Sequence, residues 1–497
     1  MDAGNSNLPR RITGVVAGYE DPSFIKVDGV DPAFTNGQTL TMSSNPFLRG
    51  NMAPVDRELT EFDLKVSGKL PPELDGVYVR NGPNPVNPPN PEKYHWFTGT
   101  GMVHGLRLGD GKAQWYRNRW VRSADVAKVL GEDAPPNPWP DDHMSFSANT
   151  NIVAHAGQLL ACVEAGAPPV EMDSELNTLS ISNLNGTLPY AFSAHPKRDP
   201  SSGELHVMTY WWGWGNQVQY LVVGTDGKVR LARDIELPGG PMIHDIAITE
   251  RYALVFDLPV LFDLDAAMGG ASLPYRWFAE YDARIGLVPR DDGPCSGDDI
   301  TWFSIDPCFI FHPMNAYDEV DADGNVRVVL DAVRHPKMFD RERRGPNEGA
   351  PRLDRWEFDV RAGTATQHTL DDYPQEFPRV REDFVGRPYR YGYSAGLGSG
   401  IAQDTLCGID MQSGSVTRRN DNDEMGYGEP VFIPREKSTA EDDGYVMALR
   451  HNRSTDLSDL CVFDAAQIAE DPVAVVHLPA RVPNGFHGNW VSSDELD

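Results

Sequence analysis

One pattern recurs along almost the whole chain: a short β-rich run, a tight turn containing Asp or Gly, often as Asp-Gly or Ser-Gly, and a second β-rich run. Glycine supplies the positive φ that a two-residue connection needs, so each copy of the pattern predicts an antiparallel hairpin. Long helical patterns are absent from the sequence. The clearest copies span residues 106–121, 154–166, 199–212, 220–237, 320–335, 355–370, 406–420 and 459–478.

So many hairpins must bury their apolar faces against one another. Radial packing of four-stranded blades achieves this burial and leaves only short strand edges. The pattern therefore favours an all-β propeller, with a large β-sandwich as the alternative. We expect residues 45–497 to form a single propeller domain. Residues 1–44 are polar and weakly patterned, and we expect them to form an N-terminal arm or wrap that is partly irregular.

The charge balance restricts the kinds of partner. The 497-residue chain has 44 Lys and Arg against 73 Asp and Glu, which gives a net charge of −29. Binding to nucleic acid needs clustered basic residues, so we expect no nucleic-acid partner. The same charge disfavours a permanent hold on anionic lipid and leaves at most weak or transient membrane contact. No obligate protein partner is evident.

The start of the chain lacks the apolar region of a signal peptide, and no window approaches the roughly 18 apolar residues of a membrane-spanning helix. Five cysteines are widely and irregularly spaced, at Cys162, Cys295, Cys308, Cys407 and Cys461. This spacing indicates reduced, mostly buried thiols of a cytoplasmic protein. A catalytic thiol has no support in the local sequence.

Four histidines lie beside strand-like or turn-like apolar segments: His195, His244, His312 and His487. A neutral imidazole binds Zn, Cu, Fe or Ni through a ring nitrogen. The gaps between them, 49, 68 and 175 residues, suit ligands from separate propeller blades that converge on one axis. They do not suit a local zinc knuckle. The simpler interpretation, that these are satisfied or exposed members of a set of 13 histidines, stays open.

At these residues the chain resembles the carotenoid cleavage oxygenases, a non-haem iron family that cleaves alkenes and includes the lignostilbene dioxygenases. The resemblance runs from about residue 45 to 490. Its motifs are VRNGPNP (79–85), YHWFTGTGMVHG (94–105), YRNRWVR (116–122), NTNIVAHAGQLLACVEAG (149–166), AHPKRDPSSGELH (194–206), MIHDIAIT (242–249), HPMNAYDE (312–319), QEFPRV (375–380), EPVFIPR (429–435) and VPNGFHGNW (482–490).

The resemblance implies a seven-bladed propeller with a cap of loops and short helices over one face. It implies one Fe(2+) on the axis, held by the four histidines. Glu164, Glu376 and Glu429 match glutamates that accept from the ring N–H groups of three iron-bound histidines, and such partners fix each imidazole in one tautomer. Thr150 matches a threonine that crowds the sixth iron position. Solvated strand-end carboxylates and a plain strand hydroxyl are the simpler interpretations of these four residues.

The implied reaction splits one alkene into two carbonyl products with O2 as co-substrate. No organic cofactor is expected, and neither a GxSxG motif nor a P-loop is present. One departure from the family pattern is Gly99-Thr100-Gly101-Met102, where GDGM is common. A zinc hydrolase and a non-catalytic binding propeller remain alternatives from other functional classes.

The wording of the motifs looks most like the bacterial carotenoid and apocarotenoid cleavers, so an apolar small-molecule alkene of that class is the expected substrate. The alternative is a smaller aromatic alkene of the stilbene, isoeugenol or 4-vinylguaiacol type. Lignostilbene-type members grip a phenol with a lysine, and Lys128, in a predicted short helix, does not match it. The short apolar stretch 256–278 suits either substrate class. The aromatic cluster Tyr210, Trp211, Trp212 and Trp214 would line a tunnel or fill a blade interface.

Overall fold

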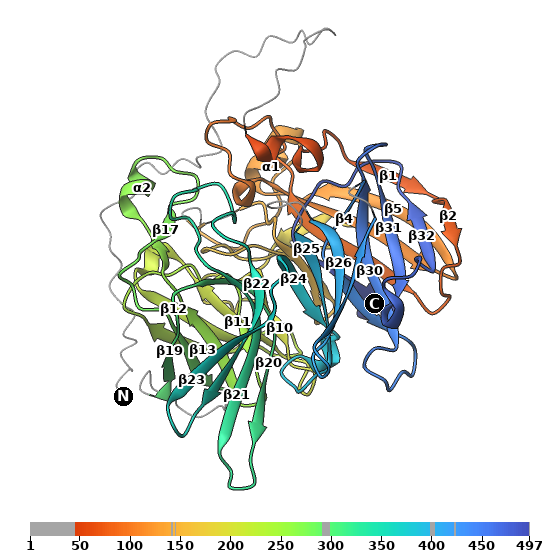
Figure 1. Cartoon of the computed structure of the whole chain (residues 1–497). Coiled ribbons are helices and arrows are strands. Elements are labelled where there is room, and N and C mark those ends of the chain that lie inside the picture. The colour runs from red at the N-terminus through yellow and green to blue at the C-terminus, as the bar shows by residue number, and fades with distance from the viewer. Residues whose placement is uncertain are drawn as a thin grey trace, which may run out of the picture.

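The computed structural model describes residues 45–140, 143–144, 146–290, 299–397, 403–421 and 424–496. Within them, seven antiparallel sheets are arranged as the blades of a propeller (Figure 1). The predicted all-β, seven-bladed fold is therefore confirmed. The predicted arm, residues 1–44, lies outside the described residues.

Blades 1 to 4 follow one another along the first part of the chain. Blade 1 contains β1 (Leu59–Phe62), β5 (Lys112–Trp120), β4 (Gly101–Gly109), β3 (Gly76–Pro83) and β33 (Gly488–Ser492). Blade 2 contains β6 (Asn151–His155), β7 (Gln158–Cys162), β8 (Val170–Met172) and β9 (Thr178–Ile181). Blade 3 contains β10 (Lys197–Arg198), β11 (Leu205–Tyr210), β12 (Gln217–Val223) and β13 (Val229–Glu236). Blade 4 contains β14 (Ala247–Ile248), β15 (Tyr252–Asp257), β18 (Arg284–Pro289) and β19 (Thr301–Ser304).

Blades 5 to 7 complete the ring. Blade 5 contains β20 (Phe309–Val320), β21 (Val326–His335), β22 (Arg352–Asp359) and β23 (Thr364–Asp371). Blade 6 contains β24 (Gln375–Val380), β25 (Tyr391–Leu397), β26 (Gln403–Asp410) and β27 (Ser415–Asn420). Blade 7 contains β28 (Met425–Tyr427), β29 (Val431–Pro434), β30 (Gly444–Asn452), β31 (Leu457–Asp464), β32 (Ala474–His477) and β2 (Val66–Gly68).

Strands from the two ends of the chain close the ring. β2 pairs with β32 at the outer edge of blade 7, and β33 pairs with β3 in blade 1, where Tyr78 faces Trp490. Both edge strands are thereby supplied by distant sequence. Blades 1 and 7 each include a strand from the opposite end of the chain, so each blade needs both ends of the chain to be complete.

The hairpin turns have the backbone that their sequences predict. Asp110 and Gly111, between β4 and β5, both have positive φ, at 53° and 69°. Ala156 and Gly157, between β6 and β7, repeat this geometry at 51° and 72°. Positive φ at both central residues gives the turn a twist that matches the twist of the flanking strands.

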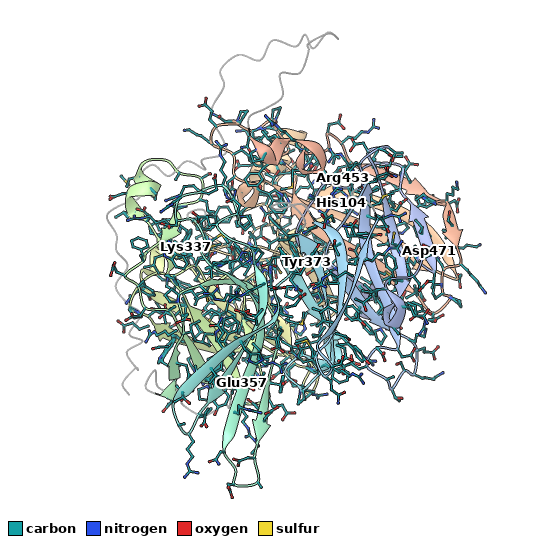
Figure 2. The ribbon with its side chains drawn as sticks, in the orientation of Figure 1. His104, Lys337, Glu357, Tyr373, Arg453 and Asp471 are labelled. Carbon is teal, nitrogen blue, oxygen red and sulfur yellow. The ribbon has the colours of Figure 1, made fainter. Side chains whose placement is uncertain are left out.

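Side chains pack the spaces between the blades (Figure 2). The largest apolar cluster joins blades 3, 4 and 5 and includes Tyr210, Phe309 and Trp356, all buried. Tyr210 thus belongs to the core. Trp211 and Trp212, half-buried, stack on Tyr190 and Phe262 at ring separations of 4.5 and 5.7 Å.

Short helices and loops project from one side of the propeller, with α1 and α2 toward the top of Figure 1. The predicted helix around Lys128 is α1 (Ala124–Leu130), which begins after the capping residue Ser123 and ends at Gly131 in the left-handed conformation. The other α-helices among the described residues are α2 (Leu264–Met268) and α3 (Ser493–Leu496), and several short 3-10 helices accompany them. β16 (Val260–Phe262) pairs with β17 (Tyr275–Trp277) near α2.

Thr100, at the departure from GDGM, makes the turn contacts itself. Its hydroxyl donates to the Asn84 carbonyl and accepts from the Val86 N–H, both at 2.9 Å. Four cysteines in the described part of the chain are free and buried. Across the same residues, no helix has both the length and the apolar character needed to cross a membrane.

Candidate metal centre

Each blade contributes one polar residue from the start of its innermost strand. Antiparallel blades place these strand starts around one axis, so residues far apart in sequence meet there. In order around the ring these residues are His487 before β33, Thr150 before β6, His195 before β10, His244 before β14, His312 in β20, Glu376 in β24 and Glu429 before β29. This arrangement explains the long sequence gaps between the histidines.

The structure brings the four predicted histidines together. One ring nitrogen from each lies within 4.8 Å of the others, and all four side chains are buried. Nε2 of His244 and Nε2 of His312 are 3.3 Å apart. Nε2 of His195 has no hydrogen-bond partner among the described residues, although it is buried. A buried, unpartnered imidazole nitrogen aimed at three others is typical of a metal site.

Glutamates stand behind three of the rings. Nδ1 of His244 lies 3.0 Å from Glu164, Nδ1 of His312 lies 2.5 Å from Glu376, and Nδ1 of His487 lies 2.9 Å from Glu429. Nδ1 is hydrogen-bonded to the glutamate in His312 and His487, whereas His244 and Glu164 are in close contact without hydrogen-bond geometry. A carboxylate behind a ring directs the other ring nitrogen toward the metal position. All three predicted glutamates therefore lie next to the histidines, and none is a solvated strand end.

Each glutamate has a second partner, and no sequence motif links any of the three partners to its glutamate. Tyr210 is the second partner of Glu164. Nε2 of His335 lies 2.7 Å from Oε1 of Glu376, and the Arg379 guanidinium lies 3.3 Å from the Glu429 carboxylate. The three partners come from strands or loops with no motif spacing relative to the glutamates. Only the packing of neighbouring blades shows which polar group lies behind which carboxylate.

The electrostatics favour neutral rings beside charged carboxylates. Burial lowers the pKa of His195 far below its ordinary value, and the neighbouring imidazoles lower it further. Burial also lowers the pKa values of His312 and His487 and outweighs the adjacent carboxylates. Burial lowers the pKa of His244 as well, but the Glu164 carboxylate outweighs it and the net pKa is raised. A neutral imidazole is the form that binds a metal ion.

The pKa values of two of the glutamates are lowered as well, which keeps these carboxylates charged. Burial tends to raise the pKa values of Glu376 and Glu429, but His312 and His487 lower them by more, so both pKa values end below the ordinary one. Charged glutamates beside neutral imidazoles supply negative charge that would offset a bound cation.

Thr150 lies next to His487 at the axis. Its carbonyl accepts from the His487 N–H at 3.1 Å, and its hydroxyl donates to Asn149 Oδ1 at 2.9 Å. The residue is buried. Its predicted effect on a metal position stays a prediction.

Two different environments border the histidines. Phenylalanines pack against the rings, with Phe311 at 5.0 Å from His244 and Phe377 at 5.3 Å from His312. A separate cavity of about 330 Å³ is lined by His195, His312 and His487 together with charged side chains. The centre is therefore bordered by aromatic rings and by a cavity whose lining mixes charged and apolar side chains.

Comparison with known proteins identifies the family. The family model described as retinal pigment epithelial membrane protein matches residues 52–492. A carotenoid cleavage oxygenase from Mycobacterium tuberculosis is 43% identical, over 90% of this chain and 98% of that protein. The chain belongs to the carotenoid cleavage oxygenase family. It is accordingly an oxygenase, and its four buried histidines form a site that can hold the metal ion on which this family depends.

Solved structures of family members share the architecture. The Pseudomonas brassicacearum lignostilbene dioxygenase has a TM-score of 0.81 at 28% identity, covering 92% of this chain and all of its own. A cobalt-substituted apocarotenoid oxygenase from Synechocystis has a TM-score of 0.79 at 26% identity, covering 88% of this chain and 97% of its own. Carotenoid cleavage oxygenases of both substrate types are thus similar to this chain.

Proposed function

We propose that the chain is a non-haem Fe(2+) dioxygenase that cleaves a carbon–carbon double bond of a carotenoid or apocarotenoid with O2 and releases two carbonyl products. The observation that carries the proposal is the set of four buried imidazoles with ring nitrogens within 4.8 Å, three of them backed by glutamates.

The residues present fit a metal ion. Metal–nitrogen distances of about 2.1 Å place ligand nitrogens up to about 4.2 Å apart, close to the observed spread. Nε2 of His195 is buried without a partner, as an open ligand would be. Imidazole alone does not select iron over zinc, and the family assignment favours iron.

Four neutral ligands would leave the ion its full positive charge. When bound, ferrous iron would supply the electrons that allow O2 to react with an alkene. The chain's own residues have positioning roles in this proposal. Glu164, Glu376 and Glu429 hold the rings of His244, His312 and His487, and we propose that Thr150 narrows the space beside His487.

The aromatic border is the side proposed to receive the alkene. Phe311 and Phe377 cover histidine rings, and Phe97 lies 5.9 Å from Phe311. Sites for small apolar molecules are lined mainly by apolar and aromatic side chains such as these. No organic cofactor, nucleic acid or obligate protein partner is needed for the reaction.

A specific observation keeps the smaller aromatic alkene as the second candidate. The similar lignostilbene dioxygenase structure has the higher TM-score, whereas the relative at 43% identity is a carotenoid cleavage oxygenase. Lys128 is exposed on α1, whose buried residues are its neighbours Val126 and Ala127. An exposed lysine does not hold a phenol in a buried pocket, which favours the carotenoid class.

A substrate panel with and without O2 tests the proposal. The panel contains β-carotene, an apocarotenal, resveratrol, isoeugenol and 4-vinylguaiacol, and the products are identified by mass. We expect O2-dependent cleavage of a carotenoid or apocarotenal into two carbonyl fragments. Cleavage of resveratrol or isoeugenol alone would support the second candidate. Turnover that continues without O2 would overturn both and support a hydrolase.

A further inference from the structure

His195 is held differently from the other three histidines. Its Nδ1 faces a carboxylate too, but that carboxylate belongs to Asp245 and lies 3.6 Å away. The three glutamate contacts are 2.5 to 3.0 Å long. A separation of 3.6 Å is too long for a direct hydrogen bond. The Asp245 carboxylate therefore does not orient the His195 ring by direct contact, as the glutamates do for the other rings.

Asp245 is fixed in place from both sides. It follows His244 directly, and its side chain is 1% exposed. Its Oδ1 accepts from the Ile246 N–H at 2.6 Å, and its Oδ2 accepts from Lys197 Nζ at 2.9 Å. Lys197 is the first residue of β10, two residues after His195. The ion pair therefore joins blade 3 to blade 4 immediately behind the His195 ring.

The gap between His195 and Asp245 borders the cavity of mixed lining beside the metal centre. His195, Lys197 and Asp245 all line this space of about 330 Å³. A water molecule needs only about 10–15 Å³ and two to four polar partners, and both conditions are met here. Water between polar groups more than 3.5 Å apart transmits a hydrogen bond nearly as well as direct contact.

We propose that Asp245, held by Lys197, is the positioning residue of His195 and acts on its Nδ1 through water from the cavity. Two consequences distinguish this fourth anchor from the glutamates. The Nδ1 proton of His195 exchanges with solvent faster than those of the other rings. The carboxylate acts on His195 through a water molecule and not by direct contact, so His195 receives the weakest support of the four.

The test uses Co(2+) as the only added ligand, because this ion gives paramagnetically shifted signals from ring N–H protons. The inference rests on the proposed metal site, and cobalt binding by the parent chain checks that site. We expect the cobalt-loaded parent to show four exchangeable ring N–H signals, one of which is broadened by fast exchange with water. Four signals with equal exchange rates would overturn the proposal without any variant.

Asp245→Asn tests the carboxylate, and Asp257→Asn is its matched control. Asp257 is a buried acid on β15 of the same blade, paired with Arg284 at 2.7 Å, and it does not line the cavity. We expect Asp245→Asn to shift the fast-exchanging signal and to speed cobalt release to a chelator at least about tenfold, as lost ligand support does elsewhere. Asp257→Asn should change neither.

Lys197→Met provides a second variant with the carboxylate in place. We expect it to speed cobalt release by less than Asp245→Asn does, because Asp245 keeps its Ile246 contact. Release rates and spectra that are the same in Asp245→Asn and Asp257→Asn would overturn the proposal. A parent chain that binds neither cobalt nor iron would instead contradict the proposed function.

Discussion

At His312 two groups fix the ring. Glu376 accepts from its Nδ1 at 2.5 Å, and Phe377 stacks on it with ring centres 5.3 Å apart. Glu376 is in turn held by His335 at 2.7 Å. A ring confined in this way has one tautomer and one direction for its Nε2, which is what a metal ligand requires.

Glu376→Gln should weaken metal binding. Glutamine retains the size of the side chain but removes the charge that accepts from His312, so we expect iron affinity to fall about 10–100-fold. The measurement is iron release to a chelator. Glu357→Gln is the control, because Glu357 lies on β22 of blade 5, the blade that carries His312, low in the view of Figure 2, and forms an ion pair of 3.3 Å with Arg327. Equal iron release from the two variants would contradict the role of Glu376.

The site residues differ in how well sequence predicts them. His195 and its three counterparts have a distinctive residue type, and family motifs mark them and the glutamates. His335 lies outside these motifs, and Asp245 and Arg379 lie within MIHDIAIT and QEFPRV without a role assigned to them. Which acid or base lies behind a ring or a glutamate is defined by the packing of one blade on the next. Sequence therefore predicts the histidines and their glutamates but not the groups behind the glutamates or beside His195.

Among the elements, the turn after β7 is sterically constrained beside the centre. Glu164 lies two residues before Gly166, whose φ is +109°. A Cβ at Gly166 would lie 2.4 Å from Cδ1 of Trp211. Only glycine allows Trp211 to pack against the segment that carries Glu164.

Gly166→Ala should therefore destabilise the fold by about 1–3 kcal/mol and reduce activity, because the clash forces Trp211 or the Glu164 segment to move. Gly157→Ala is the matched control in the same blade, since φ there is also positive but nothing lies within 4 Å of the new Cβ. We expect it to cost about 1 kcal/mol and to leave activity intact. Urea unfolding and turnover measure both effects. Equal activity loss in the two variants would refute the steric explanation.

Two hairpins each contain a buried histidine–tyrosine pair. His104 and Tyr116 join β4 to β5 at 3.0 Å, and His206 and Tyr220 join β11 to β12 at 2.6 Å. Burial, followed by the charge of Arg290, lowers the pKa of His206 from 6.5 to about 3. The unfolded chain protonates this histidine below its ordinary pKa, whereas the folded chain does not, so stability falls as the pH drops through this window.

His206→Gln should reduce that pH dependence. At about 1.4 kcal/mol per pH unit, one histidine accounts for about 2 kcal/mol of the stability lost between pH 6.5 and pH 5. We expect the free energy of unfolding of the variant to fall by about that much less than in the parent. Urea unfolding at about pH 7 and about pH 5 measures the difference. An unchanged pH dependence would show that His206 does not titrate in this way.

Considered as a whole molecule, the propeller is predictable in its repeats but not in its closure. Each hairpin is encoded by residues adjacent in sequence, so its turn and strands are evident locally. The pairing of β2 with β32 and of β33 with β3 joins segments about 400 residues apart, and no local pattern indicates it. Because no local pattern shows where the ring closes, only the family resemblance predicts that there are seven blades.

Closure also determines whether the centre exists. His487 precedes β33, so it reaches the other three histidines only when the end of the chain returns to blade 1. The centre is therefore a property of the complete ring. Loss of one ligand should empty it without unfolding the blades, because each blade keeps its own hairpins.

The metal content of the parent and of His312→Ala, both purified from iron-supplemented cells, tests the central claim most directly. We predict about one iron per chain in the parent. We predict little iron in His312→Ala, with the β-rich circular dichroism spectrum unchanged. Full iron content in His312→Ala, or zinc or no metal in the parent, would contradict the claim that four imidazoles hold one ferrous ion.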